Sequence, residues 1–274
     1  MPPRGYPESM ARDKEKKIRL GGMALGNGVL VHGPTAWACA IRHEDGRLEV
    51  ASARKRFQAS KVSSPFLRGP ARLAEALALL PQVKRALPGA QLPMQSAGTV
   101  VAMVGSAVAA KGLRESTRIR PLAQELLVGI LSMAPAALAL RTGELAAYHG
   151  AEHISIGTYE HGEGATKEHE RCGGHLIGPL LATTAVGNVL ARLAPPQARN
   201  QARLAAQVGA VATSMEIFGW MTRHPDTIAA KALSKPGHEL QHRLSTADPT
   251  PAQLEVAEAA LAACLELEHG ADDR

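Results

Sequence analysis

Four long runs without a charged residue lie beyond residue 85 of this chain and constrain its fold more than any other feature. They cover residues 86–110, 126–140, 176–191 and 204–215. Their apolar residues are mostly alanine, leucine and valine, and alanine and leucine favour helices over strands. Because only 3% of the 274 residues are aromatic, we do not expect a large all-β fold. We therefore predict a mainly α protein with a bundle-like helical domain.

The same runs could cover a protein core or face lipid. A membrane-spanning helix needs about 20 mostly apolar residues, and only the run 86–110 is that long. Lysine and arginine occur on both sides of each run, so no positive-inside asymmetry orients the chain. With a mean hydropathy of −0.08, we expect a cytoplasmic protein or one associated with the cytoplasmic membrane.

Charge and cysteine content exclude two further classes of protein. The net charge of +6 comes from scattered basic residues, and the aromatic platforms on which single-strand binders stack bases are nearly absent. We therefore expect no nucleic-acid partner. The three cysteines are too few and too far apart for a disulfide framework, which indicates a reducing compartment or a single cysteine with a role of its own.

The chain divides into three segments by composition. Residues 1–18 are polar and charge-rich, which predicts a flexible tail. Residues 19–62 are glycine-rich and carry two β-compatible runs around Asp45 and Gly46, which predicts a hairpin. Residues 63–270 form the helical domain.

Two helices of this domain have recognisable limits. The pattern after Pro65 is helical, and we expect Pro70 and Pro81 to interrupt it. At the other end, Thr250 and Pro251 are suited to the N-cap and first position of a C-terminal helix.

The strongest functional pattern lies in residues 149–175. His149, Glu152 and His153 form H-x-x-E-H, and on a helix this spacing places all three side chains on one face. In the inverted zincin motif, two such imidazoles hold Zn²⁺ and the glutamate acts as general base. We therefore predict that His149 and His153 are metal ligands and that Glu152 is catalytic.

A further ligand must come from another part of the chain. His169, Cys172 and His175 follow at intervals of three, and Gly173 with Gly174 permits a tight ligand-bearing turn. Imidazole nitrogen and one thiolate suit zinc well and iron less well. We predict that all three can contribute to the metal centre.

Two other interpretations of this segment stay open. The histidines could belong to a polar helix end whose hydrogen bonds are all internal. Alternatively, Cys172 precedes an expected helix start near His175, and we expect the helix dipole and nearby histidines to lower the pKa of its thiol. A thiolate beside a histidine base would make Cys172 the catalytic nucleophile of a cysteine-dependent hydrolase.

A second motif, H-E-x-x-H, spans His238 to His242. Zincins carry this motif on a long core helix, whereas here it follows Pro236 and Gly237 and is soon ended by Pro249. We expect a chance match.

Five sequence blocks together resemble a known family. They are GGMALGNGVLVHGP (21–34), SPFLRG (64–69), YHGAEHISIGTYE (148–160), HERCGGH (169–175) and LSTADPTPAQLEVAEAAL (244–261). The chain resembles, over about residues 20–267, the DUF1385 (YqhQ-like) family, whose members are regarded as metal-dependent enzymes and often as membrane proteins. This chain has Asn27 where the family usually has a glutamate that would be suited to complete the site.

These observations give one leading hypothesis and two alternatives. The leading one is a zinc- or iron-dependent enzyme, a hydrolase in which Glu152 moves protons, acting on a small molecule or a peptide. The first alternative is a non-catalytic protein of the membrane or of an assembly, with a structural metal. The second is the hydrolase that uses Cys172. A homo-oligomer is compatible with each.

Overall fold

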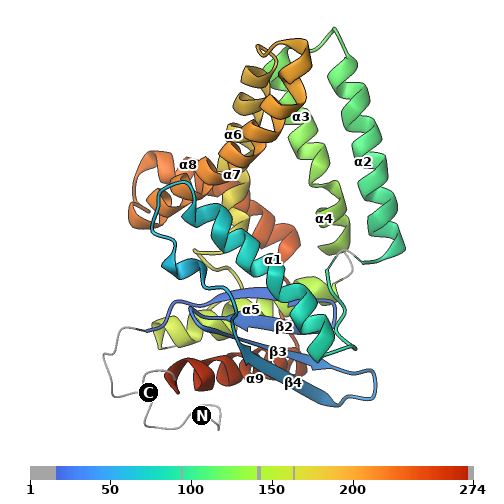
Figure 1. Cartoon of the computed structure of the whole chain (residues 1–274). Coiled ribbons are helices and arrows are strands. Elements are labelled where there is room, and N and C mark those ends of the chain that lie inside the picture. Colours follow the sequence, from blue (N-terminus) through green and yellow to red (C-terminus); the bar gives the residue numbers. More distant parts are fainter. Residues whose placement is uncertain (1–16, 94, 141–142, 163, 271–274) are drawn as a thin grey trace.

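The computed structural model describes residues 17–93, 95–140, 143–162 and 164–270. A β-sheet with helices on both faces forms one part of the molecule, and a bundle of helices extends from it (Figure 1). Helices dominate the described residues, as predicted. The expected tail, residues 1–18, lies outside them except for Lys17 and Ile18.

The sheet is an antiparallel meander of four strands. These are β1 (Gly21–Leu25), β2 (Gly28–His32), β3 (Ala36–Arg42) and β4 (Leu48–Arg54), paired in that order. The hairpin predicted around Asp45 and Gly46 joins β3 to β4, with Gly46 at φ +84° in the turn. A second hairpin, which the sequence analysis did not anticipate, pairs β1 with β2.

One face of the sheet packs against α5 (Glu144–His161) and α9 (Pro251–His269). Val29 and Val31 lie in this core together with Val256 and Leu261 of α9. Glu268, near the end of α9, is buried. Its carboxylate accepts hydrogen bonds from the backbone N–H groups of Thr35 and Ala36. The predicted boundary at residue 62 therefore separates chain segments that share one core.

The predicted start of the C-terminal helix is confirmed. The hydroxyl of Thr250 accepts a hydrogen bond from the backbone N–H of Gln253, and the side-chain Oε1 of Gln253 accepts one from the backbone N–H of Thr250. This reciprocal arrangement is a capping box.

The opposite face of the sheet packs against α1 (Arg68–Ala86). Along the strands, the residues buried against α1 alternate with those buried against α5 and α9, as the pleat of a β-strand requires. The expectation that prolines interrupt this helix is wrong. Pro70 lies in the first turn, where its missing N–H has no partner to lose, and Pro81 removes only the hydrogen bond to the carbonyl of the exposed Leu77.

The remaining α-helices among the described residues form the bundle. They are α2 (Ala97–Glu115), α3 (Pro121–Ser132), α4 (Ala134–Leu140), α6 (Ile177–Ala191), α7 (Arg199–Arg223) and α8 (Ile228–Leu240). Short helical turns flank these helices, namely η3 (Gly173–Leu176), η4 (Pro196–Ala198) and the π-helix η5 (Gln241–Ser245). A further short turn, η2 (Ala59–Lys61), lies between β4 and α1. Far from the sheet, the buried Glu125 carboxylate pairs with Arg114 and Arg192.

Two segments of the bundle are long and apolar enough to cross a membrane, 121–140 and 173–191. Less than a third of the most apolar stretch of each is buried within the protein. On α2, the side chains of Val100, Val101, Val104 and Val108 are exposed as well. The run 86–110, the only one judged long enough from sequence, is divided instead, because α1 ends at Ala86 and α2 begins at Ala97.

Candidate metal centre

Helix α5 carries the H-x-x-E-H motif on a buried face. The helix lies between the sheet and the segment that leads into α9. The side chains of the motif are accordingly buried, with His153 2% exposed and Glu152 7% exposed. Gly150 permits this close approach, because a Cβ there would lie 2.1 Å from the carbonyl oxygen of Ala247. The motif is therefore held between two backbone segments.

Backbone carbonyls fix both imidazole rings. The Nδ1 of His149 donates to the carbonyl oxygen of Ser245 at 2.7 Å, and that of His153 donates to the carbonyl oxygen of Lys167 at 2.6 Å. In a neutral ring with a protonated Nδ1, the lone pair is on Nε2. Both Nε2 atoms therefore carry the lone pair that a metal ion would take, and the carbonyls supply the outer hydrogen bonds that metal-binding histidines generally need.

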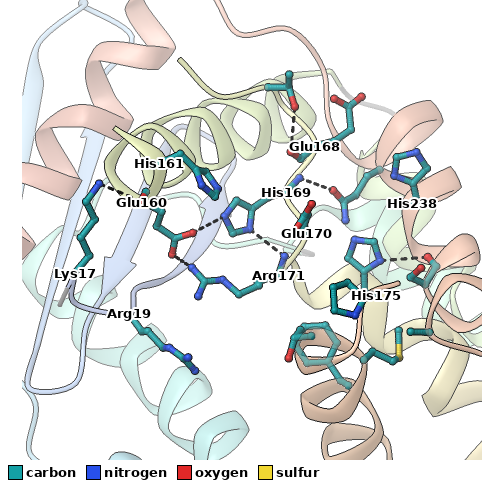
Figure 2. A pocket seen from close by; sticks show the side chains of 18 of the residues that line it. Lys17, Arg19, Glu160, His161, Glu168, His169, Glu170, Arg171, His175 and His238 are labelled. Carbon is teal, nitrogen blue, oxygen red and sulfur yellow. Dashed lines mark hydrogen bonds and ion pairs between the residues drawn. The ribbon is translucent and has the colours of Figure 1, made fainter. Parts of the chain in front are cut away.

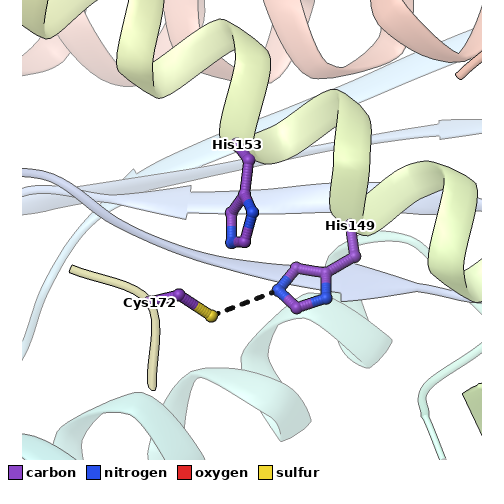
Figure 3. Close-up of side chains that lie close together, drawn as sticks. All are labelled: His149, His153 and Cys172. Carbon is purple, nitrogen blue, oxygen red and sulfur yellow. Dashed lines mark hydrogen bonds between the residues drawn. The ribbon is translucent and has the colours of Figure 1, made fainter. Parts of the chain in front are cut away.

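Cys172 completes a group of three donors (Figure 3). It is the N-cap of η3, where its Sγ accepts a hydrogen bond from the backbone N–H of Gly174, and it lies 3.6 Å from His149 Nε2. The ligand atoms of His149, His153 and Cys172 all lie within 4.8 Å of one another. Tetrahedral Zn–S and Zn–N bonds of about 2.3 and 2.05 Å place sulfur and nitrogen about 3.6 Å apart, which is the separation of Cys172 Sγ and His149 Nε2.

Glu152 lies beside the two imidazoles without belonging to the group of three. Its Oε2 is 3.8 Å from the Nε2 of His149 and 3.8 Å from that of His153. Strand β1 passes directly over this carboxylate, and a Cβ at Gly22 would lie 2.1 Å from Glu152 Oε1. Burial, together with the charge of Glu160, raises the pKa of Glu152 to about 8. In the metal-free chain this carboxyl group therefore holds a proton at neutral pH.

The metal-free environment also keeps the two histidines neutral. Burial lowers the pKa of His149, and burial with the nearby His149 lowers that of His153 to about 3. Neutral imidazole is the form that binds metal. The expected lowering of the Cys172 pKa is wrong for this state, because burial raises it to about 12. A thiol that keeps its proton is a poor nucleophile, so the cysteine-dependent interpretation loses its main support.

His169 lies next to the centre and makes other hydrogen bonds. Its ring is 5.5 Å from that of His153, but its Nε2 donates to Glu160 at 3.1 Å and its Nδ1 accepts the backbone N–H of Arg171. Arg171 also pairs with Glu160. The structure therefore places His169 in a network that holds the 169–172 segment in position and places Cys172 beside His149.

His175 and the second motif lie apart from the three donors. His175 is buried, and its Nδ1 donates a hydrogen bond to the carbonyl oxygen of Ser234. His238 and His242 are exposed and stack on each other, with ring centroids 6.5 Å apart, and His242 pairs with Glu168. Among the described residues, His175, His238 and His242 belong to no group of three close donors.

Several residues that support the site were not anticipated. Ser245 and Lys167 act through main-chain carbonyls, which no motif can reveal, and Ser245 ends the π-helix η5, a form often found at functional sites. Gln241, at the start of η5, accepts the backbone N–H of His169.

Asn27 lies in the β1–β2 turn, where its side chain bonds to backbone groups of Arg42, Gly89 and Gln91.

Comparison with known proteins identifies the family. The family described as "Protein of unknown function (DUF1385)" matches residues 128–267, which include α5, η3 and every candidate ligand. The match is shorter than the resemblance over residues 20–267 and leaves the sheet outside it. Neither the curated proteins nor the solved structures gave a match. Since the matching segment makes up just over half of the chain, the protein belongs to the DUF1385 family.

Proposed function

We propose that this protein is a metal-dependent enzyme, a hydrolase whose metal is held by His149, His153 and Cys172. The convergence of these three donors carries the proposal. Each imidazole has its Nδ1 occupied by a carbonyl, so that the coordinating nitrogen of each is available. Zinc is the preferred ion because a mixed nitrogen and thiolate set favours it, and iron is second.

The residues of the chain suit hydrolysis when three protein ligands hold the ion. Catalytic zinc sites use three protein ligands, whereas structural sites use four. A zinc ion held by these residues would act as a Lewis acid that polarises a substrate and lowers the pKa of a bound water. Glu152 Oε2, 3.8 Å from both Nε2 atoms, would take a proton from the attacking water and return it to the leaving group.

Metal content tests this centre. We expect about one zinc per chain in the wild-type protein, little in His153→Ala and Cys172→Ser, and the wild-type amount in His238→Ala. The last variant is a control that removes an exposed histidine of the second motif. Equal metal content in all four proteins would refute the site.

A structural metal is the second candidate, and the position of Glu152 favours it as well. A carboxylate so near both imidazoles could coordinate as the fourth ligand. The variant Glu152→Gln separates the two functions. In an enzyme it keeps its zinc and loses hydrolysis of small ester and peptide substrates, whereas in a structural site it loses zinc affinity.

The exposed apolar bundle supports association with a membrane. The segments 121–140 and 173–191 are long enough to span one, and less than a third of the most apolar stretch of each is buried among the described residues. The second segment begins one residue after Cys172, so the metal centre would lie close to the lipid surface. Recovery of the full chain in the soluble fraction without detergent would contradict this assignment.

A further inference from the structure

The end of the bundle away from the sheet gathers basic residues from two distant segments of the chain. The turn between α2 and α3 and the turn between α6 and α7 lie together there (Figure 1). We call the basic residues on and beside these turns the basic tip. They are Lys111, Arg114, Arg118, Arg120, Arg192, Arg199 and Arg203.

The basic tip carries most of the net charge of the protein. Its two stretches, 111–125 and 192–203, contain seven basic residues and two acidic ones, Glu115 and Glu125. This leaves an excess of five positive charges, and the net charge of the whole chain is +6. Basic residues that are scattered in the sequence are therefore concentrated by the fold at one end of the molecule.

A buried carboxylate joins the two turns. Glu125 of α3 pairs with Arg114 of α2 at 3.2 Å and with Arg192, which follows α6, at 2.7 Å. Gln124 accepts a further hydrogen bond from Arg192 at 2.6 Å. Because these contacts cross from one helix pair to the other, they hold the basic tip in one arrangement.

The other five basic residues form no salt bridge among the described residues. Lys111, Arg118, Arg120 and Arg199 are exposed, and Arg203 is half-buried. Like charges held close together repel one another, and an anion bound between them would relieve this repulsion. The arrangement therefore favours an anionic partner.

The cavity of about 780 Å³ beside the metal centre shows a different balance of charge (Figure 2). Its walls hold as many carboxylates as lysine and arginine side chains. These residues are Lys17, Arg19, Arg171, Glu160, Glu168 and Glu170. Their charges do not indicate an anion, whereas the excess at the basic tip does.

The helices that lead to the basic tip carry no charge over a long distance. The runs 86–110, 126–140, 176–191 and 204–215 contain no charged residue, and the basic tip lies between them in the sequence. The segment 121–140 has 20 residues, and at 1.5 Å per residue it rises about 30 Å, which is the thickness of the hydrocarbon core of a bilayer. If the bundle spans a membrane, the basic tip lies at the level of the lipid head groups.

Exposed apolar side chains at the basic tip favour lipid over nucleic acid. Leu193 is 81% exposed and Leu204 is 65% exposed, and both are close in sequence to arginines of the basic tip. The stretches 111–125 and 192–203 contain no aromatic residue on which a base could stack.

We propose that the basic tip binds the phosphate groups of anionic phospholipids. The unpaired lysine and arginine side chains contact the head groups, and Leu193 and Leu204 lie among the acyl chains. This inference rests on the association of the bundle with a membrane, proposed above, and adds to it the class of lipid and the residues that bind the lipid.

Native mass spectrometry of the full chain in dodecyl maltoside, an uncharged detergent, tests the proposal. It counts the lipids bound from dioleoyl phosphatidylglycerol and from dioleoyl phosphatidylcholine, which have the same acyl chains and differ in net charge. A basic residue near an anionic surface strengthens binding about fivefold. We therefore expect phosphatidylglycerol to bind at least about tenfold more tightly than phosphatidylcholine.

Paired substitutions assign this preference to the basic tip. Arg118→Gln with Arg120→Gln removes two exposed charges and should weaken phosphatidylglycerol binding about tenfold or more, with phosphatidylcholine binding unchanged. Arg72→Gln with Arg85→Gln removes two exposed charges from α1, which packs on the sheet, and should match the wild type.

Three results would overturn the inference while leaving membrane association intact. They are equal affinity of the wild type for the two lipids, an unchanged preference in the folded Arg118→Gln and Arg120→Gln double variant, and tighter binding of a single-stranded RNA oligonucleotide than of phosphatidylglycerol. Recovery of the chain without detergent would instead contradict membrane association, and this inference with it.

Discussion

Replacing Glu152 by glutamine should change how the stability of the metal-free protein depends on pH. The substitution preserves size and removes a carboxyl group whose pKa burial raises from 4.5 to about 8. Between these values the folded protein binds a proton that the unfolded chain releases. Stability therefore falls as pH rises through this window, and the glutamine variant lacks this loss.

The effect is cleanest between pH 6.5 and 8. His149 and His153 have lowered pKa values, so they act in the opposite direction, but their contribution is complete above pH 6.5, the ordinary value for histidine. Over the remaining 1.5 pH units Glu152 should cost the wild type about 2 kcal/mol, at about 1.4 kcal/mol per unit. For a chain of this size that is a difference of about 4–8 °C in Tm.

Urea unfolding with chelator present, at half-unit steps of pH, measures this difference. Glu115→Gln, an exposed carboxylate at the end of α2, is the matched control and should follow the wild type. Adding zinc should flatten the wild-type curve, because a cation beside Glu152 favours its charged form. A constant difference between Glu152→Gln and wild type across this range would refute the assignment of a proton to Glu152.

Three further substitutions test one contact beside the site and two contacts elsewhere in the fold. Gly22→Ala places a methyl group where the Glu152 carboxylate lies, and thermal unfolding should show a loss of about 1–3 kcal/mol; an unchanged Tm would mean that β1 does not hold the carboxylate. Glu268→Ala leaves two backbone N–H groups, including that of Ala36, without an acceptor, and urea unfolding should show a loss of about 3 kcal/mol, with a loss below experimental error counting against the contact. Thr250→Ala removes the helix cap and should cost about 1 kcal/mol in the same assay, whereas Thr250→Ser should be nearly neutral; equal losses would argue against the capping box.

The sequence was informative wherever the signal is local. The cap at Thr250, the turn at Gly46 and the placement of His149, Glu152 and His153 on one helix face all depend on residues within about one turn. Short-range rules of spacing and turn chemistry are sufficient for such features.

The remaining features depend on contacts between distant segments. Whether His169 or Cys172 faces His149 is decided by the bonds of Glu160 and Gln241 to the 169–172 segment, and spacing in sequence cannot distinguish the two candidates. The thiol pKa was predicted from neighbouring charges, but burial outweighs them. Similarly, α1 continues through Pro81 because Leu77, whose carbonyl loses its helical hydrogen bond, is exposed to solvent.

The π-helix beside the metal centre has a consequence for insertions and deletions. A π turn holds one residue more than the α turn that it replaces, so residues 241–245 carry an extra residue relative to a regular helix. Shortening this segment by one residue would restore α-helical hydrogen bonding, but it would rotate the following carbonyl by about 100° away from His149. Because Ser245 acts through its main chain, replacing its side chain would leave the ring of His149 in place. The length of the segment, more than its side chains, is what orients this ligand.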